Sequence, residues 1–348
     1  MSKFEIGGRP IGNEYPPLVI AEIGINHEGR LEKAIKMVDD AKESGCECVK
    51  FQYHIPSKEM IPNSVIPGNA KESIWEIISR CTLSDDDERA VKKYSEQQGL
   101  IYLSTPFSRE AADNLAEMGV NWFKIGSGEC NNFPLIKHIA RFGKPIILST
   151  GMNDIESISI AVNIFREHHI PYALMHCTSL YPTPYEKVRL GALDELRSEF
   201  PDAIIGLSDH SIGNYTCFAA IALGASIVEK HFTSDPKWPG PDVPISITPG
   251  ELSQLVAGTV AIYKASGGSK TVLAEESVTI DFAYSSVVTI AEIKKGEIFS
   301  LENIWVKRPG NGEILACDYE SLLGQSAARD IPPDTQICWS DVISSKIE

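Results

Sequence analysis

The sequence predicts an α/β fold, a (β/α)8 barrel followed by a smaller β-rich domain. Short apolar runs typical of buried strands alternate with segments of helical periodicity over residues 1–268. Eight such runs occur, and a barrel of this class takes ~250 residues. A doubly wound sheet is the alternative, but its first βα turn usually has a Gly-x-Gly-x-x-Gly pattern, which Gly24–Gly29 lacks.

The predicted strands are apolar, as expected of parallel strands buried on both faces. Apolar residues at helical spacing between Leu31 and Ala41 predict the first helix. A later helix is expected after Ser84, a good N-cap residue, because the carboxylates of residues 85–88 complement a helix dipole. The eight predicted strands are Leu18–Ile23, Cys48–Phe51, Leu100–Ser104, Trp122–Ile125, Pro145–Ser149, Tyr172–His176, Ala203–Leu207 and Ile227–Lys230.

The pattern changes after Gly267–Lys270. Residues 269–284 are expected to form an extended, helix-poor linker, and residues 285–348 a small domain of short β segments and polar turns. These β segments are expected near Ser286–Val288, Ile293–Glu297 and Ile304–Gly312. A domain this small is close to the lower limit of independent stability, so we expect it to pack on the barrel or on a partner subunit.

Composition excludes several classes of protein. The net charge of −15 argues against a surface for nucleic acid or an anionic membrane. No segment has the ~20 apolar residues of a membrane span, and the first residues lack the apolar core of a secretion signal. The eight cysteines have no Cys-x-x-Cys spacing and are interpreted as reduced thiols. These features favour a cytoplasmic protein.

Two histidines follow neighbouring predicted strands: His210 comes after Ala203–Leu207, and His231 after Ile227–Lys230. The carboxyl ends of barrel strands meet at one mouth, where the active sites of such barrels lie. Since neutral imidazole is a common ligand of transition metals, the pair predicts a catalytic metal site with open coordination positions. His176 is either a further metal ligand or a buried core histidine, and the remaining five histidines, His54 among them, look like loop or helix-surface residues.

Polar side chains also follow most of the other strands. Lys50 and Lys124 supply positive charge, and serine and threonine hydroxyls supply directional donors, a combination suited to a phosphorylated or doubly anionic substrate. Strands buried on both faces are otherwise apolar, so this pattern indicates a binding site. The strand-end residues include Glu22, Gln52, Thr105, Ser127, Glu129, Ser149, Tyr181, Ser208, Asp209 and Glu229.

Several motifs made of these residues resemble the sialic acid synthase family, which comprises bacterial N-acetylneuraminate synthase and related nonulosonate synthases. Together they extend over essentially the whole chain. The matching segments are Ala21–His27, Leu103–Phe107, Phe123–Glu129, Leu148–Met152, His176–Thr178, Tyr181–Pro184, Gly206–His210, Glu229–Thr233, Gly240–Asp242 and Lys307–Gly310.

The resemblance implies a TIM barrel followed by an antifreeze-like (SAF, β-clip) domain, in a domain-swapped homodimer. It implies a metal-dependent transferase that condenses phosphoenolpyruvate with open-chain N-acetylmannosamine and water, giving N-acetylneuraminate and phosphate by C–O cleavage. His210 and His231 would hold Mn²⁺, with Mg²⁺ or Co²⁺ as alternatives. Lys50, Thr105, Lys124, Ser127, Ser149, Tyr181 and Ser208 would surround phosphoenolpyruvate. Glu22, Gln52, Asn69 and Asp242 would line the sugar, and Arg308 would reach it from the other subunit.

This reaction needs a carboxylate that positions or deprotonates the water added to the phosphate-bearing carbon. Glu129, expected beside the phosphate, is the first candidate, and Glu22 is the second. The metal would act as a Lewis acid on the aldehyde oxygen of the sugar.

Three alternatives stay open at the level of sequence. Phe51 and Tyr53 flank Gln52, and residues 234–240 and 243–246 also depart from the sialic-acid-forming pattern, so a more apolar sugar site could accept a diacetamido trideoxy hexose and give a legionaminate-type product; the aromatic residues could equally be packing residues. A Schiff-base pyruvate aldolase using Lys124 or Lys50 would need no metal. An ice- or glycan-binding protein is the non-enzymatic alternative, although fold similarity does not carry function.

Overall fold

Eight parallel strands form the centre of a computed structural model that describes residues 3–343. The strand order is β5-β4-β3-β10-β9-β8-β7-β6, and β5 also lies beside β6, so the sheet closes into a barrel. All eight predicted strands are present, each with its ends within two residues of the expected positions. The bounds are β3 Leu18–Gly24, β4 Cys48–Tyr53, β5 Ile101–Pro106, β6 Phe123–Ile125, β7 Ile146–Ser149, β8 Tyr172–Cys177, β9 Ile204–Asp209 and β10 Ile227–His231.

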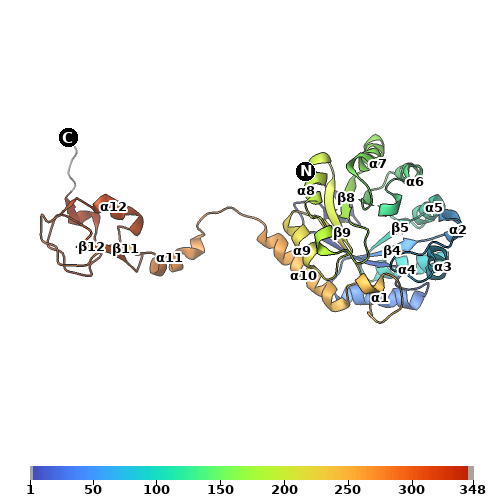
Figure 1. Cartoon of the computed structure of the whole chain (residues 1–348), viewed down its shortest axis with the longest axis horizontal. Helices are drawn as coiled ribbons and strands as arrows, with labels where there is room; N and C mark the ends of the chain where they lie inside the picture. Colours follow the sequence, from blue (N-terminus) through green and yellow to red (C-terminus); the bar gives the residue numbers. More distant parts are fainter. Residues whose placement is uncertain (1–2, 344–348) are drawn as a thin grey trace. The chain divides into compact units, whose positions relative to one another are not determined.

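Helices surround the strands and cover their outer face (Figure 1). Apolar side chains from the helices and from the outer face of the strands form the largest core, for example Val38, Val49 and Leu115. The helices are α1 Leu31–Glu43, α2 Pro56–Glu59, α3 Ile74–Cys81, α4 Asp85–Gln97, α5 Arg109–Glu117, α6 Phe133–Ala140, α7 Ile155–Glu167, α8 Ala192–Glu199, α9 Tyr215–Ala222 and α10 Pro249–Ala265. Among the described residues, no helix has the length and apolar character needed to cross a bilayer.

A second core fills the barrel near the amino ends of the strands. Side chains such as Ile20, Leu103 and Ile147 pack there against an antiparallel hairpin of β1 (Phe4–Ile6) and β2 (Arg9–Ile11). This apolar layer closes one end of the barrel. The polar cavity lies at the opposite end, at the carboxyl ends of the strands.

The helix predicted after Ser84 is α4, and the Ser84 hydroxyl accepts a hydrogen bond from the Asp87 amide as expected of an N-cap. Glu88 differs from the other carboxylates of this turn. It is buried, and Tyr102 donates a hydrogen bond to it at 2.9 Å. Glu88 is the last of the four carboxylates of the acidic first turn, and its side chain is buried.

The carboxyl-terminal part is a separate compact unit that begins at Gly268. Its core includes Val287, Phe299 and Ile331. The segment predicted as helix-poor contains a short helix, α11 (Ser277–Ala283), because Glu276 and the apolar residues after it continue a helical turn begun at Ala274. The remaining elements are β11 Ser286–Thr289, β12 Ile304–Lys307, α12 Tyr319–Leu322, β13 Ser326–Ala327 and β14 Val342–Ile343.

The β segment expected at Ile293–Glu297 is not a strand; Ile293 makes one isolated bridge with Ile331. The other two expected segments contain β11 and β12, which pair antiparallel. The predicted domain limits also include residues 1–2 and 344–348, which lie outside the described residues.

Candidate active site

A cavity of about 470 Å³ opens at the carboxyl ends of the barrel strands. Most of the residues predicted from the sequence line it, although they are scattered over more than 200 positions of the chain. The barrel topology brings them together because they come from the carboxyl-terminal parts of the strands and from the loops that follow them. The predicted residues in the lining are Glu22, Lys50, Gln52, Asn69, Thr105, Lys124, Ser127, Ser149, Tyr181, Ser208, His210, His231 and Asp242.

Four buried charges of alternating sign form the floor of this cavity. Lys50 Nζ lies 2.8 Å from Glu22 Oε2 and 3.6 Å from Glu229 Oε1. Lys124 Nζ lies 3.9 Å from the same Glu229 oxygen and donates a hydrogen bond to Ser149 Oγ at 2.6 Å. Each of these side chains is less than one-tenth exposed. Their mutual contacts compensate the cost of burying four charges without water.

These contacts set the protonation of the group. Burial raises the pKa of Glu22, against the opposing effect of Lys50. The pKa of Glu229 is lowered, because the effect of Lys124 and Lys50 outweighs burial, which alone would raise it. Burial lowers the pKa of Lys124, whereas Glu22 and Glu229 outweigh burial and raise the pKa of Lys50. Lys50 is therefore the more firmly cationic of the two lysines, and of the two carboxylates Glu22 is the one whose pKa is raised.

The two histidines predicted as metal ligands face each other across the ends of β9 and β10. Their ring centroids are 5.3 Å apart, and Tyr181 stacks on His210 at 4.2 Å. The Nδ1 atom of His210 lies 3.0 Å from the carbonyl oxygen of Thr178, which leaves Nε2 as the nitrogen available to a ligand. His231 Nδ1 is buried without a hydrogen-bond partner and lies 3.8 Å from Asp242 Oδ2.

This arrangement fits a divalent metal ion. Burial lowers the pKa of His231 well below its usual value, so its imidazole is neutral at pH 7 and its unpartnered nitrogen can act as a ligand. Over residues 3–343, no cluster of three or more His, Cys, Asp or Glu side chains is arranged to hold a metal ion. The histidine pair would therefore supply two protein ligands and leave the other coordination positions open.

One side of the cavity carries the groups expected to face the sugar. Asn69 donates a hydrogen bond to the carbonyl oxygen of Pro241 at 3.1 Å and lies 3.5 Å from Asp242. Burial raises the pKa of Asp242 to about 6. The same side is partly apolar, because the segment between β4 and α4 folds over it. Its apolar lining residues are Ile25, Met60, Pro67, Ile74, Ile77 and Ile78.

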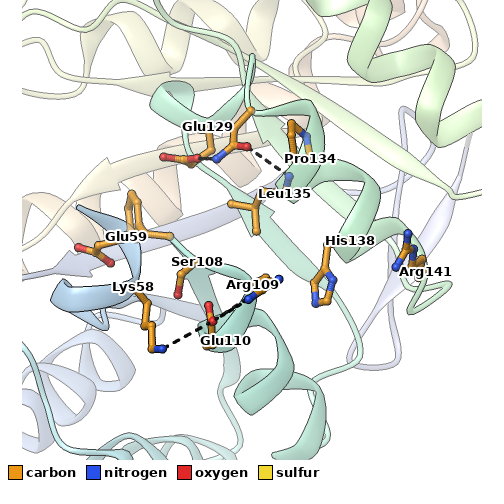
Figure 2. A pocket seen from close by; sticks show the side chains of 12 residues that line it. Lys58, Glu59, Ser108, Arg109, Glu110, Glu129, Pro134, Leu135, His138 and Arg141 are labelled. Carbon is orange, nitrogen blue, oxygen red and sulfur yellow. Dashed lines mark hydrogen bonds and ion pairs between the residues drawn. The ribbon is translucent and has the colours of Figure 1, made fainter. Parts of the chain in front are cut away.

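Glu129, the first candidate for activating water, does not line this cavity. It lies in a neighbouring cavity of about 560 Å³ with Lys58, Ser108 and Arg109, and it accepts a hydrogen bond from Asn132 (Figure 2). Ser127–Glu129 forms a 3-10 turn, in which successive side chains point in directions about 120° apart. Ser127 therefore faces the main cavity while Glu129 faces its neighbour.

The aromatic residues beside Gln52 are packing residues and do not line the cavity. Phe51 and Tyr53 are buried in the core between the barrel and its helices, while Lys50 and Gln52 face the cavity. This alternation follows from the two-residue period of a strand. Trp238 lies in the second segment that departs from the sialic-acid-forming sequence pattern. It packs against the same core, and Lys33 lies over its ring. Arg308 lies directly after β12, exposed, in the carboxyl-terminal unit.

From the sequence, Glu229 was a strand-end carboxylate expected to support a metal-binding histidine. In the structure it contacts both lysines and accepts a hydrogen bond from Ser208 at 2.9 Å. The sequence held a signal for this position, because Glu229 alternates with Val228 and Lys230 along β10 and so points to the opposite face of the strand. His54 and Glu59 also line the cavity, although His54 looked like a loop or surface residue from the sequence.

Comparisons with known proteins identify the family of the chain. The NeuB family model matches residues 37–271, and the SAF domain model matches residues 284–343. The N,N'-diacetyllegionaminic acid synthase of Campylobacter jejuni is 38% identical over 330 residues, which cover 92% of this chain and 98% of the relative. Human N-acetylneuraminate-9-phosphate synthase is 33% identical, covering 86% of this chain and 85% of the relative.

A solved structure is similar over most of its length. The crystal structure of the N-acetylneuraminic acid (sialic acid) synthetase of Leptospira borgpetersenii matches with a TM-score of 0.73 and 32% identity. The match covers 80% of this chain and 95% of that one. The chain belongs to the NeuB family, that is, to the sialic acid synthases, and combines their (β/α)8 barrel with a SAF domain.

Proposed function

We propose that this nonulosonate synthase is an N-acetylneuraminate synthase, which condenses phosphoenolpyruvate with open-chain N-acetylmannosamine and water to give N-acetylneuraminate and phosphate. The observation that carries the proposal is the shared cavity: two buried lysines with hydroxyl donors lie in one part, and two facing histidines beside Asp242 in another. An anionic three-carbon substrate and a polar aldehyde can meet there.

Phosphoenolpyruvate binds through Lys50 and Lys124. Both ammonium groups are buried, so their attraction for a phosphate or carboxylate is little screened by water. Thr105, Ser127 and Ser149 supply hydroxyl donors from neighbouring strands. The ion pairs with Glu229 hold both lysines in place before the substrate arrives, which reduces the cost of reorganisation.

His210 and His231 would hold a divalent metal ion, with Mn²⁺ favoured over Mg²⁺ or Co²⁺. A metal ion bound there supplies a Lewis acid for the aldehyde oxygen. Asp242 and Asn69 orient the sugar next to the histidines, and Gln52 offers its amide to the sugar hydroxyls. These side chains fix the aldehyde carbon toward the enol carbon of phosphoenolpyruvate.

Bond formation leaves a cationic centre at the phosphate-bearing carbon, and a water molecule adds to it. Glu22 is the carboxylate that takes the proton of this water, because it lies in the cavity and burial raises its pKa toward neutrality. Phosphate then leaves by C–O cleavage, so the bridging oxygen leaves with phosphorus. The enzyme itself need not be phosphorylated.

A second sugar is supported by a specific observation. The apolar lining contributed by Ile74, Ile77 and Ile78 lies on the side of Asn69 and could accept the methyl group of a 6-deoxy sugar. The product would then be N,N'-diacetyllegionaminate. The buried positions of Phe51 and Tyr53 remove the earlier argument for this sugar, so the case rests on these isoleucines alone.

The homodimer and the role of Arg308 are part of the proposal. We infer that the carboxyl-terminal unit of one subunit serves the barrel of the other and brings Arg308 to the acetamido group of the sugar. The exposed guanidinium of Arg308 supports such a role.

The fate of the bridging oxygen tests the reaction. Phosphoenolpyruvate carrying ¹⁸O at the bridging position should give ¹⁸O-labelled phosphate with either sugar, measured by mass spectrometry. Label retained in the nonulosonic acid would contradict C–O cleavage. Covalent trapping of pyruvate by borohydride at Lys124 or Lys50 would instead establish the Schiff-base aldolase.

A further inference from the structure

His54 lies just after β4 and is almost fully buried, with 6% of its surface exposed. Its ring stacks on Phe107 with centroids 4.4 Å apart and planes inclined by 14°. Nδ1 lies 2.9 Å from Glu59 Oε1, and Nε2 lies 3.1 Å from Gln52 Oε1. Glu59 is held in turn by the Ile55 amide. The imidazole therefore links the carboxylate of α2 with the Gln52 side chain of the active-site cavity.

Both ring nitrogens of His54 face oxygen acceptors. A neutral imidazole has only one N–H, so it could satisfy only one of these contacts. An imidazolium paired with the Glu59 carboxylate satisfies both.

The Gln52 amide is fixed at its other end by the catalytic carboxylate. Its Nε2 group donates a hydrogen bond to Glu22 Oε1 at 2.8 Å. If the amide turned over, its oxygen would face the Glu22 oxygen and its NH₂ would face the N–H of His54. Both contacts would then be repulsive. A doubly protonated His54 therefore selects one of the two orientations of Gln52.

We propose that His54, paired with Glu59, is a positioning residue that holds the Gln52 amide so that it donates to Glu22. The effect on turnover rests on the proposed function of Glu22, whereas the hydrogen-bond arrangement does not. A chain of hydrogen bonds runs from Glu59 through His54 and Gln52 to Glu22, and each of these residues lines the cavity.

Two substitutions separate positioning from simple packing. The amide nitrogen of glutamine can replace Nε2 of histidine, and that of asparagine can replace Nδ1. H54Q therefore keeps the donor toward Gln52, and H54N keeps only the donor toward Glu59.

We expect H54N to lower kcat/KM for the sugar by about tenfold or more, and H54Q by less than about threefold. H138N is the matched control, since His138 pairs with Asp113 at 2.7 Å outside this cavity, and it should change kcat/KM by less than about twofold.

The affinity for phosphoenolpyruvate alone, measured by quenching of intrinsic fluorescence, should stay within about twofold in all three variants. Equal losses of kcat/KM in H54Q and H54N would overturn the proposal, because a packing role does not distinguish the two donors.

A spectroscopic test of the proposal does not depend on which substrate the enzyme uses. In protein labelled with ¹⁵N-histidine, the imidazole resonances of His54, assigned by their loss in H54N, should show both nitrogens protonated at pH 7.5. The E59Q variant should convert His54 to a neutral ring. A neutral His54 in the unmodified protein would overturn the proposal. Protonated nitrogens in a protein that turns over neither sugar would contradict only the proposed function.

Discussion

Lys230 Nζ lies 2.6 Å from Asp209 Oδ2, and each of these residues directly precedes one of the two facing histidines, His231 and His210. The pair is buried, and the Thr216 and Ser211 hydroxyls also donate to Asp209. Because successive strand residues point to opposite faces, this cluster lies behind the histidines. It ties β9 to β10 and thereby sets the spacing of the histidine rings.

Removing the cation of this pair should be costly. K230M leaves the Asp209 carboxylate buried without its partner, so we expect the free energy of unfolding in urea to fall by about 3–5 kcal/mol. The control is K36M, which removes an exposed lysine paired with Asp40 at 2.9 Å and should cost less than about 1 kcal/mol. Similar losses in the two variants would show that the buried pair does not stabilise the barrel.

The buried carboxyl of Glu88 should make stability depend on pH. Burial raises its pKa to about 8, while an unfolded chain has a value near ~4.3. Between these values the folded state holds a proton that the unfolded state has released. The free energy of unfolding therefore falls as pH rises through this window. We expect E88Q to be more stable than the unmodified protein by about 1–3 kcal/mol at pH 8.5, with a smaller difference at pH 5.

Chemical denaturation at several pH values measures this effect. D86N, a change of an exposed carboxylate in the same helical turn, provides the control and should show no such trend. An E88Q curve parallel to that of the unmodified protein would mean that Glu88 is ionised in the fold.

Lys124 should be needed for phosphoenolpyruvate. K124M removes one of two buried cations and leaves Ser149 without its donor, so we expect phosphoenolpyruvate to bind about 100-fold more weakly or not at all in calorimetry. The control is K137M, which removes the same charge from an exposed position of α6. This variant should bind phosphoenolpyruvate normally. Unchanged binding by K124M would remove Lys124 from the phosphate site.

The sequence predicted the barrel well because parallel strands buried on both faces produce apolar runs that stand out from the helices. Strand residues such as Lys50 and His231 were also placed correctly in the cavity, since the strand ends converge. Directions within turns were not predictable: Ser127 and Glu129 are two residues apart and face different cavities. Glu88 shows the same difficulty, because an acidic run does not reveal which carboxyl turns inward.

If Arg308 acts across a dimer, two inactive variants should complement each other. R308A and H231A subunits, mixed in equal amounts and allowed to exchange, should recover about one-quarter of the normal activity, because about half of the dimers are heterodimers and each of these has one intact site of two. Activity is measured as phosphate release after exchange has been verified by mass spectrometry. No recovery in verified heterodimers would contradict the arrangement in which Arg308 serves the other subunit.

The most direct test of the proposed function is phosphate release from phosphoenolpyruvate by protein stripped with EDTA, with and without added Mn²⁺. N-acetylmannosamine and 2,4-diacetamido-2,4,6-trideoxymannose are supplied in parallel. The proposal predicts release that requires both Mn²⁺ and N-acetylmannosamine, and that is lost in H210N, whose fold is checked by circular dichroism. Preference for the second sugar would identify the legionaminate-type reaction. Release that is unaffected by EDTA, or no release with either sugar, would contradict the account.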